Sequence, residues 1–256
     1  MTKLYHIGFG RSDLSDKPPT LALLSGDPGR AERIAKDNLA DVEVLSENRG
    51  LHSYVGTLPS GAKLLSATSG MGAPSLSIIV NELVQVGIET VIRVGTCGSI
   101  QPQVKTGSVV ISSGALCRQG AANDIAPPEY PAVADPFLTV KLAETAQAEG
   151  VEHHVGITAS VDTFYEGQGR TGSANPHLIR AQQGVVEEYG HLNILNFEME
   201  AGTLFKMANV YGFKAACICA VIAQRTDAED VVLEQKDAAV ARAIAVAVKT
   251  AEAVSS

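Results

Sequence analysis

The sequence has few cysteines, no long apolar run and fewer basic than acidic residues. The four cysteines, at positions 97, 117, 217 and 219, form no Cys-x-x-Cys pair. Two of them fall within a strand that is predicted to be buried. This usage is more typical of reduced thiols in a cytosolic protein than of disulfides or a zinc site.

Hydropathy and charge exclude two further classes. The most apolar run, 215–223, is too short to span a bilayer, and residues 1–11 lack the apolar core of a signal peptide. Lysine and arginine number 20 against 28 acidic residues, a formal charge of −8, which argues against a nucleic-acid binder. We therefore expect a cytoplasmic protein without a membrane or nucleic-acid partner.

Common catalytic signatures are missing as well. The sequence contains no Walker A, HExxH or GxSxG motif. Glycines 167, 169 and 172 match GxGxxG, but Asn175-Pro176 interrupts the helix that a dinucleotide site requires. No metal, covalent nucleophile or cofactor is therefore expected.

The pattern of strands and helices favours an α/β protein. Apolar residues make up 45% of the chain, enough for a sizeable core. Strands and helices alternate without a linker or an internal repeat, so a single domain over 1–256 is expected, with a three-layer α/β/α fold and a central mixed, largely parallel sheet. Strands are predicted at 21–24, 42–45, 51–58, 63–68, 91–94, 107–113, 155–160, 192–197 and 213–222, and helices from 28 onward and at 75–86, 135–149, 177–189, 198–211 and 232–254.

The stretch 91–100, V-I-R-V-G-T-C-G-S-I, carries the clearest chemical signal. Its β-branched residues predict a buried strand, which the small residues from Gly95 to Ser99 are expected to end. Arg93 within this strand is costly to bury unless it meets a fixed anion. Two interpretations are equally open: a pocket for a small oxyanion, or a tight turn beside a structural salt bridge.

A second anion-friendly feature is S-G-D-P-G-R, residues 25–30. Asp27 is expected to cap a helix that begins at Pro28, with Arg30 in its first turn. A helix N-terminus beside an arginine suits an anion. An ordinary connection with a surface arginine explains the same residues, and by itself that interpretation is favoured.

Five motifs in order resemble the nucleoside phosphorylase family, and the likeness extends over nearly the whole chain. They are S-G-D-P-G-R (25–30), S-G-M-G-A-P-S (69–75), R-V-G-T-C-G-S (93–99), T-F-Y-E-G-Q-G-R (163–170) and F-E-M-E-A (197–201). The resemblance implies reversible phosphorolysis of uridine to uracil and ribose 1-phosphate, a reaction of pyrimidine salvage. Negative charge then develops on the departing base while the sugar becomes cationic.

The resemblance implies three subsites, with Arg93, Gln168, Arg170 and Glu200 as the catalytic residues. Phosphate would be bound by Gly26, Arg30, Arg93 and Thr96, with Arg49 from a neighbouring subunit. Ribose would be bound by Glu198, Met199 and Glu200, with His6 from the adjacent subunit. The base would be bound by Phe164, Gln168, Arg170 and Ile222.

Specificity for a pyrimidine is favoured by the residues at the end of the last predicted strand. Purine-specific relatives tend to carry an acid there, whereas this chain reads A-V-I-A-Q-R-T from 220 to 226. A broader or purine-specific phosphorylase is the alternative. A nucleosidase is disfavoured by the arginines, and a non-catalytic binding protein by the lack of two lobes and a hinge.

The resemblance also implies a homohexamer built from dimers that share active sites. Related enzymes often hold potassium between subunits with a glutamate after the arginine, but position 50 is Gly50. We therefore expect weak or absent potassium dependence. The acidic run 224–234 is a candidate lid, and Arg93→Ala is expected to damage turnover more than folding.

Overall fold

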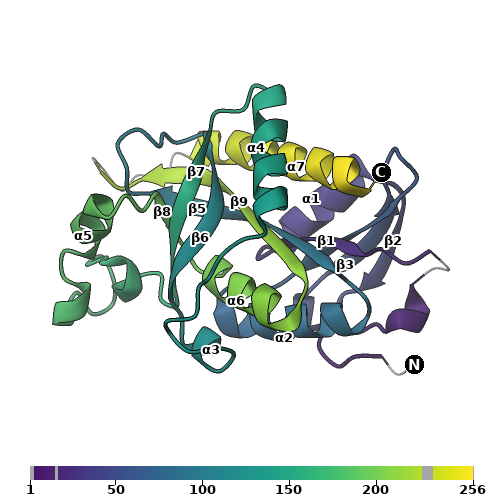
Figure 1. The fold of residues 1–256 in the computed structure, drawn as a ribbon, viewed down its shortest axis with the longest axis horizontal. Helices are drawn as coiled ribbons and strands as arrows, with labels where there is room; N and C mark the ends of the chain where they lie inside the picture. Colours follow the sequence, from purple (N-terminus) through teal and green to yellow (C-terminus); the bar gives the residue numbers. More distant parts are fainter. Residues whose placement is uncertain (1–2, 15–16, 227–232, 256) are drawn as a thin grey trace.

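Nine strands form one mixed sheet in the computed structural model, which describes residues 3–14, 17–226 and 233–255 (Figure 1). The order along the sheet is β2-β3-β4-β1-β5-β8-β7-β6-β9. The bounds are β1 Leu21–Ser25, β2 Ala40–Ser46, β3 Ser53–Thr57, β4 Lys63–Thr68, β5 Thr90–Ser99, β6 Val109–Arg118, β7 His153–Val161, β8 Asn196–Glu198 and β9 Lys214–Gln224.

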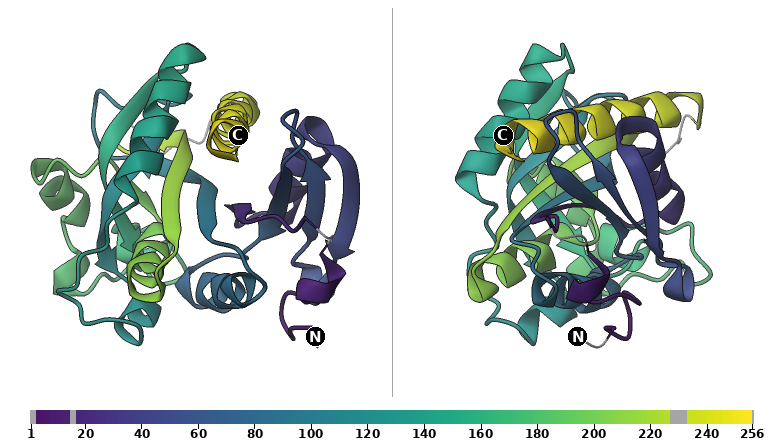
Figure 2. Two further views of the ribbon diagram at one scale, coloured as in Figure 1. Left: turned by 45° about the vertical axis from the view of Figure 1, so that its right-hand side comes forward. Right: turned by 90° about the vertical axis from the view of Figure 1, so that its right-hand side faces the viewer.

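Helices cover both faces of this sheet (Figure 2). In Figure 1, α4 and α7 lie above it, and α2, α3 and α6 lie below. The bounds are α1 Pro28–Asn38, α2 Ala73–Gln85, α3 Gly120–Asn123, α4 Pro136–Ala148, α5 Val185–His191, α6 Ala201–Tyr211 and α7 Leu233–Ser255. One apolar cluster joins the sheet to α2 and α6, and another joins it to α1, α4 and α7. The predicted three-layer α/β fold with a mixed sheet is confirmed.

Strand β5 is the hub of the sheet. It pairs with β9 along its length, with β1 from Thr90 to Arg93, and with β8 at Gly98 and Ser99. Because β9 also pairs with β6, the strands β5, β8, β7, β6 and β9 close into a ring. Between the ends of β1 and β8, one edge of β5 changes neighbours. Such switch points are where open α/β sheets place their ligands.

The glycines of β5 do not end the strand as expected, since β5 continues through them to Ser99 with a bulge between Cys97 and Gly98. A Cβ at Gly95 would lie 2.8 Å from the sulfur of Cys219 and 2.9 Å from Nη2 of Arg93. Glycine is therefore required at this position to leave room for the side chain of Arg93.

The starts of helices α1 and α4 were predicted correctly from their cap residues. Asp27 accepts a hydrogen bond from the amide of Gly29, and Asp135 accepts from Phe137 and Leu138. Both helices begin at the proline that follows the cap.

The predicted helix 177–189 is wrong in extent. A 3₁₀ turn, η4 (Arg180–Gln182), and then α5 occupy this region, because Gly184 adopts a left-handed conformation with φ 72° before α5 begins. The strand expected at 192–197 is reduced to Asn196–Glu198, and α6 begins at Ala201 rather than at Glu198. The four-residue helix α3 lies at the start of the expected loop 120–134.

The predictions on the cysteines, the candidate lid and membrane spans can also be compared with the structure. All four cysteines are free thiols, as expected, and the sulfurs of Cys217 and Cys219 lie 3.6 Å apart. Residues 227–232 of the candidate lid lie outside the described residues. Within the part of the chain that the structure describes, no helix has the length and hydropathy needed to cross a membrane.

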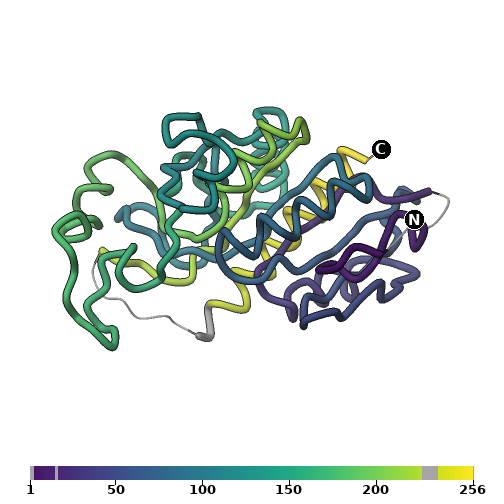
Figure 3. Tube along the Cα trace, turned by 90° about the horizontal axis from the view of Figure 1, so that it is seen from below, coloured from purple at the N-terminus to yellow at the C-terminus, as the bar shows by residue number. Residues whose placement is uncertain are grey.

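The N-terminal segment and the loops between β7 and α5 lie at opposite ends of the molecule. Figure 1 shows this from the front, and Figure 3 shows it from below, with the purple N-terminal chain on the right and the green loops on the left. Segments that carry residues predicted for a single site therefore lie at opposite ends of the folded molecule.

Candidate active site

A cavity of about 480 Å³ opens where β5 exchanges β1 for β8. It is lined by eleven of the predicted site residues: Gly26, Arg30, Arg93, Thr96, Phe164, Gln168, Arg170, Glu198, Met199, Glu200 and Ile222. The chain thus brings together the predicted phosphate, ribose and base subsites. Two predicted residues, His6 and Arg49, do not line it.

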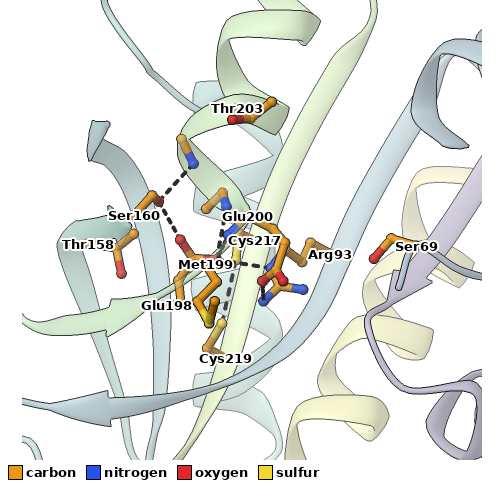
Figure 4. A network of polar contacts seen from close by, with 12 residues as sticks. Ser69, Arg93, Thr158, Ser160, Glu198, Met199, Glu200, Thr203, Cys217 and Cys219 are labelled. Carbon is orange, nitrogen blue, oxygen red and sulfur yellow. Dashed lines mark hydrogen bonds and ion pairs between the residues drawn. The ribbon is translucent and has the colours of Figure 1, made fainter. Parts of the chain in front are cut away.

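At the centre of the cavity wall, Arg93 is held between two carboxylates (Figure 4). Its Nε lies 3.1 Å from Oε2 of Glu198, and its Nη2 contacts Oε2 of Glu200. All three side chains are buried. Burial lowers the pKa of Arg93, but Glu200 and Glu198 outweigh it, so the net shift is upward. Of the two interpretations, the salt bridge is present, and it faces a cavity.

This ion cluster also stabilises the fold. Removing one partner of a buried ion pair costs about 3–5 kcal/mol, because the remaining charge is left uncompensated. Arg93→Ala would leave Glu198 and Glu200 facing each other without a cation. The expectation that this substitution damages turnover more than folding is therefore revised: both should suffer.

Glu198 uses both of its oxygens to anchor its surroundings. Oε1 accepts from the hydroxyl of Ser160, and Oε2 accepts from the amides of Glu200 and Ala201 at 2.8 and 2.9 Å as well as from Arg93. Burial and the neighbouring Glu200 raise the pKa of Glu198 to about 7, against the opposing effect of Arg93. With its acceptors occupied, Glu198 is suited to hold Arg93 and the following turn rather than a ligand.

The N-terminus of α6 is capped entirely from outside the helix. The amide of Gly202 donates to Oγ of Ser160 at 2.8 Å, and the amide of Thr203 donates to Oε1 of Gln119 at 2.9 Å. Glu200 occupies the N-cap position, yet its side chain makes no capping hydrogen bond. Helices normally need such partners for their first amides. Because other residues supply them, the carboxylate of Glu200 remains available to the cavity.

Two groups orient the carboxylate of Glu200, which takes no part in capping α6. It contacts Arg93, and its Oε1 accepts from the amide of Gly72 at 2.5 Å. Gly72 adopts a positive φ of 84° in the turn before α2, a conformation that favours glycine. The motif at 69–75 therefore contributes a backbone donor to the site.

The predicted phosphate end contains a second buried cation. Nη1 of Arg30 donates to Oγ of Ser25 at 3.3 Å and to the carbonyl of Val94 at 3.2 Å. Its Nε has no hydrogen-bond partner, and the guanidinium has no carboxylate partner, among the described residues. Burial and the nearby Arg93 lower the pKa of Arg30. A buried guanidinium with neutral partners facing a cavity favours an anionic ligand.

The predicted base end combines an amide, a guanidinium and aromatic rings. Arg170 lies 4.3 Å from the centre of the Phe164 ring, and its Nη2 donates to Oε1 of Gln168 at 3.4 Å. Arg225 donates to the backbone carbonyl of Gln168 at 2.7 Å and lies over the ring of Phe197. Gln168 is thus buried and held from both sides.

His6 and Arg49 share a different surface. Nδ2 of Asn48 donates to the carbonyls of Tyr5 and His6, which joins the turn carrying Arg49 to the N-terminal segment. Nδ1 of His6 lies 2.6 Å from Oε1 of Glu82 on α2, and Arg49 is exposed with φ 57°. The two residues predicted to act in a neighbouring subunit therefore lie on segments that are bonded to each other.

Sequence reasoning did not identify Ser160 or Gln119. Neither residue lines the cavity. Each is distant in sequence from the turn at 198–203 and is joined to it by hydrogen bonds. The signal available in the sequence was the helix start at F-E-M-E-A, which lacks a Ser, Thr, Asp or Asn cap of its own. Such a start implies that caps come from elsewhere, but not from which residues.

Comparisons with known proteins agree with this geometry. Residues 20–255 match the family described as the phosphorylase superfamily. The chain is 40% identical to the uridine phosphorylase of Haemophilus influenzae over 229 residues, covering 90% of this chain and 89% of the relative. It is 39% identical to that of Escherichia coli strain K12 over 227 residues, covering 88% of each. It is 34% identical to the guanosine phosphorylase of Halorubrum lacusprofundi over 221 residues, covering 86% of this chain and 83% of the relative.

The raised pKa of Glu198 predicts a specific pH dependence of stability. With a pKa of about 7 against an ordinary 4.5, the folded protein binds more protons than the unfolded chain between these values. The stabilisation from this proton is therefore complete below about pH 4.5 and is lost as pH rises through 7. We expect the thermal midpoint of the wild type to fall from pH 5 to pH 8 relative to that of Glu198→Gln, as measured by calorimetry.

The amide of Glu198→Gln cannot titrate, so this variant removes the proton linkage even if it lowers stability at every pH. The comparison therefore depends on the slope with pH and not on the absolute midpoints. Parallel pH profiles for the two proteins would contradict the shifted pKa.

Proposed function

The chain belongs to the phosphorylase superfamily, and from this premise we propose that it catalyses reversible phosphorolysis of uridine to uracil and ribose 1-phosphate. Uridine phosphorylases about 40% identical over some 90% of the chain support this activity. The observation that carries it is the cavity at the β5 switch point, where two buried guanidiniums, two carboxylates and an amide–arginine pair face one space.

Phosphate occupies the end formed by Gly26, Arg30 and Thr96, with Arg93 between it and the sugar. Charge-assisted hydrogen bonds contribute about 1.5–3 kcal/mol each, so a few suffice to hold the anion in an acidic protein. Glycine at position 26 keeps the turn after β1 close to the turn at 69–72, since a Cβ there would lie 3.2 Å from the carbonyl of Gly70. Phosphate then attacks the glycosidic carbon from the face opposite to the base.

The sugar lies against Met199 and Glu200. The carboxylate of Glu200 accepts hydrogen bonds from the 2′- and 3′-hydroxyls, and its negative charge stabilises the positive charge that develops on the ribose ring. Glu198 supports this arrangement from behind through Arg93 and the turn at 199–201. It holds the geometry of the ribose subsite without directing an oxygen to the sugar.

The base lies between Phe164 and Ile222. Gln168 presents its amide to the N3–H and O2 edge of uracil, and Arg170 donates to O4, where negative charge builds as the base departs. The cation–π contact with Phe164 and the bond to Gln168 hold the guanidinium in place before substrate arrives.

A broader or purine-specific phosphorylase is the second candidate, favoured by the 34% identity to a guanosine phosphorylase. A purine leaving group needs a proton donor at N7. The residues near the end of β9 that line the cavity, Ile222 and Ala223, are apolar. This lining supports the pyrimidine over the purine.

The active unit is a dimer in which each subunit contributes its His6 and Arg49 to the active site of the other. Three such dimers form a hexamer, and the protein acts in the cytoplasm. The shared surface of the two residues, remote from the loops of their own base subsite, supports this arrangement. His6 reaches the 5′-hydroxyl of the neighbouring subunit's substrate, and Arg49 reaches its phosphate.

The first prediction on function concerns the reaction. Uridine, thymidine and inosine are incubated with the protein with and without phosphate, and base release is followed by chromatography. Release from uridine should require phosphate and yield ribose 1-phosphate, and it should exceed release from inosine. Release without phosphate would indicate a nucleosidase, and faster release from inosine would overturn the pyrimidine assignment.

The second prediction concerns the shared site. Arg49→Ala and Glu200→Gln, each inactive alone, are co-expressed at equal levels with different affinity tags. With random pairing, about half of the dimers are mixed, and each mixed dimer has both residues intact in one of its two sites. About a quarter of the wild-type activity should therefore return. Activity of the mixture no greater than that of the separate variants would show that Arg49 does not act across an interface.

The third prediction concerns cations. We propose that the dependence of activity on potassium is weak or absent, because Gly50 supplies no carboxylate at the position expected to help bind the ion. Rates in potassium chloride and in tetramethylammonium chloride at equal ionic strength should agree within about twofold. A strong preference for potassium would show that other oxygens complete the site.

A further inference from the structure

Gln119 spans the turn that carries the sugar-binding carboxylate. It follows β6 directly, is 1% exposed and does not line the cavity. Its Nε2 donates to the carbonyl of Met199 at 2.6 Å, and its Oε1 accepts from the amide and the hydroxyl of Thr203, both at 2.9 Å. One side chain therefore bridges the residues on either side of Glu200 and the first turn of α6.

The orientation of this amide is fixed by its partners. A backbone carbonyl only accepts and a backbone amide only donates, so the Gln119 amide satisfies both ends in one arrangement. The backbone that follows Gln119 is held as well, because the amide of Gly120 donates to Oδ2 of Asp162, just after β7, at 2.7 Å. Gln119 thus forms a brace between the end of β6 and the turn at 199–203.

Glu200 depends on such support. It has φ −144° and ψ −27°, outside the helix, and its side chain does not cap α6. Of the three residues that cap the helix, Glu198 and Ser160 are bonded to each other and to the Arg93 cluster. Gln119 acts from the other side of the turn, on Met199 and Thr203.

We propose that Gln119 is a positioning residue that sets the carboxylate of Glu200 against the 2′- and 3′-hydroxyls of the nucleoside, and so strengthens discrimination between ribonucleosides and 2′-deoxyribonucleosides. This inference rests on the proposed function. Gln119 touches no substrate. Its effect passes through the backbone of residues 199–203.

Loss of the Gln119 brace should affect binding of the sugar more than binding of phosphate. A displacement of about 1 Å can cost up to a hundredfold in rate when it disturbs a reacting geometry. Without the brace, the hydrogen bonds that both hydroxyls of uridine donate to Glu200 weaken, whereas 2′-deoxyuridine has only one of them to lose. Phosphate is bound by Gly26, Arg30, Thr96 and Arg93, which lie on other elements. Because Glu198 still holds Arg93 in place, the KM for phosphate should not follow.

The experiment compares Gln119→Leu and Gln119→Glu with the wild type. For Gln119→Leu, kcat/KM for uridine should fall about tenfold or more, the ratio of uridine to 2′-deoxyuridine should fall severalfold, and the KM for phosphate should stay within about twofold. Because the leucine variant removes both hydrogen bonds, it can also lower stability, which thermal unfolding measures separately.

Gln119→Glu tests the hydrogen bonds by pH. An ionised carboxylate repels the carbonyl of Met199, whereas a protonated carboxyl donates to it and still accepts from Thr203. Burial at this position raises the pKa of the introduced carboxyl, so the uridine to 2′-deoxyuridine ratio of this variant should recover as pH is lowered from 8 to 6. The titratable groups nearby are Cys117 beside Gln119 on β6, Asp162 after β7, Lys206 on α6 and Glu198 on β8. They are shared with the wild type, whose ratio provides the reference at each pH.

Gln101→Leu and Gln101→Glu are the matched controls. Gln101 is also a buried glutamine, and its Nε2 donates to the carbonyls of Gly190 and Ile194, both at 2.9 Å, away from the cavity. These variants can lose stability but should keep the nucleoside ratio at every pH. Equal losses for both nucleosides in Gln119→Leu, or no recovery of the ratio in Gln119→Glu at low pH, would overturn the inference. A wild type that does not release uracil with phosphate would instead overturn the proposed function.

Discussion

The buried ion cluster of Arg93, Glu198 and Glu200 is the interaction on which the site depends. Two carboxylates and one guanidinium are costly to remove from water, and they persist only with full hydrogen bonding. Here backbone amides, Ser160 and Gly72 supply that bonding. The same bonds that make burial tolerable fix the position of each charge, so stability and preorganisation have a common origin.

Strand β5 makes this cluster possible by its pairing. It carries Arg93 at the point where β1 ends and before β8 begins, so a side chain and an open strand edge meet there. Gly95 leaves the space that the guanidinium occupies. The ring of strands places β8, and with it Glu198, directly opposite. A closed ring and a switch point therefore have one common effect. They bring carboxylates from β8 and from the turn before α6 to an arginine on β5.

Much of this could be predicted from the sequence, and the limits have physical causes. Asp27-Pro28 and Asp135-Pro136 fix helix starts because cap chemistry is local. The helix predicted at 177–189 failed because Gly184 imposes a backbone conformation that hydrophobic spacing does not reveal. Arg93 could be recognised as needing an anion. That the anions would be Glu198 and Glu200, or that Gln119 would cap α6, depends on strand order, which a single sequence does not encode locally.

The charges of the cluster also bear on the proposed sharing of active sites between subunits. Glu198 and Glu200 together balance Arg93 and Arg30, so the four buried groups carry little net charge when all are ionised. A phosphate dianion entering beside them needs a further cation, and Arg170 lies at the base end over Phe164. On the proposed arrangement, Arg49 of a neighbouring subunit supplies that charge. Assembly would then be an electrostatic requirement of the reaction, because the carboxylates that hold the sugar already offset the charge of the chain's own arginines.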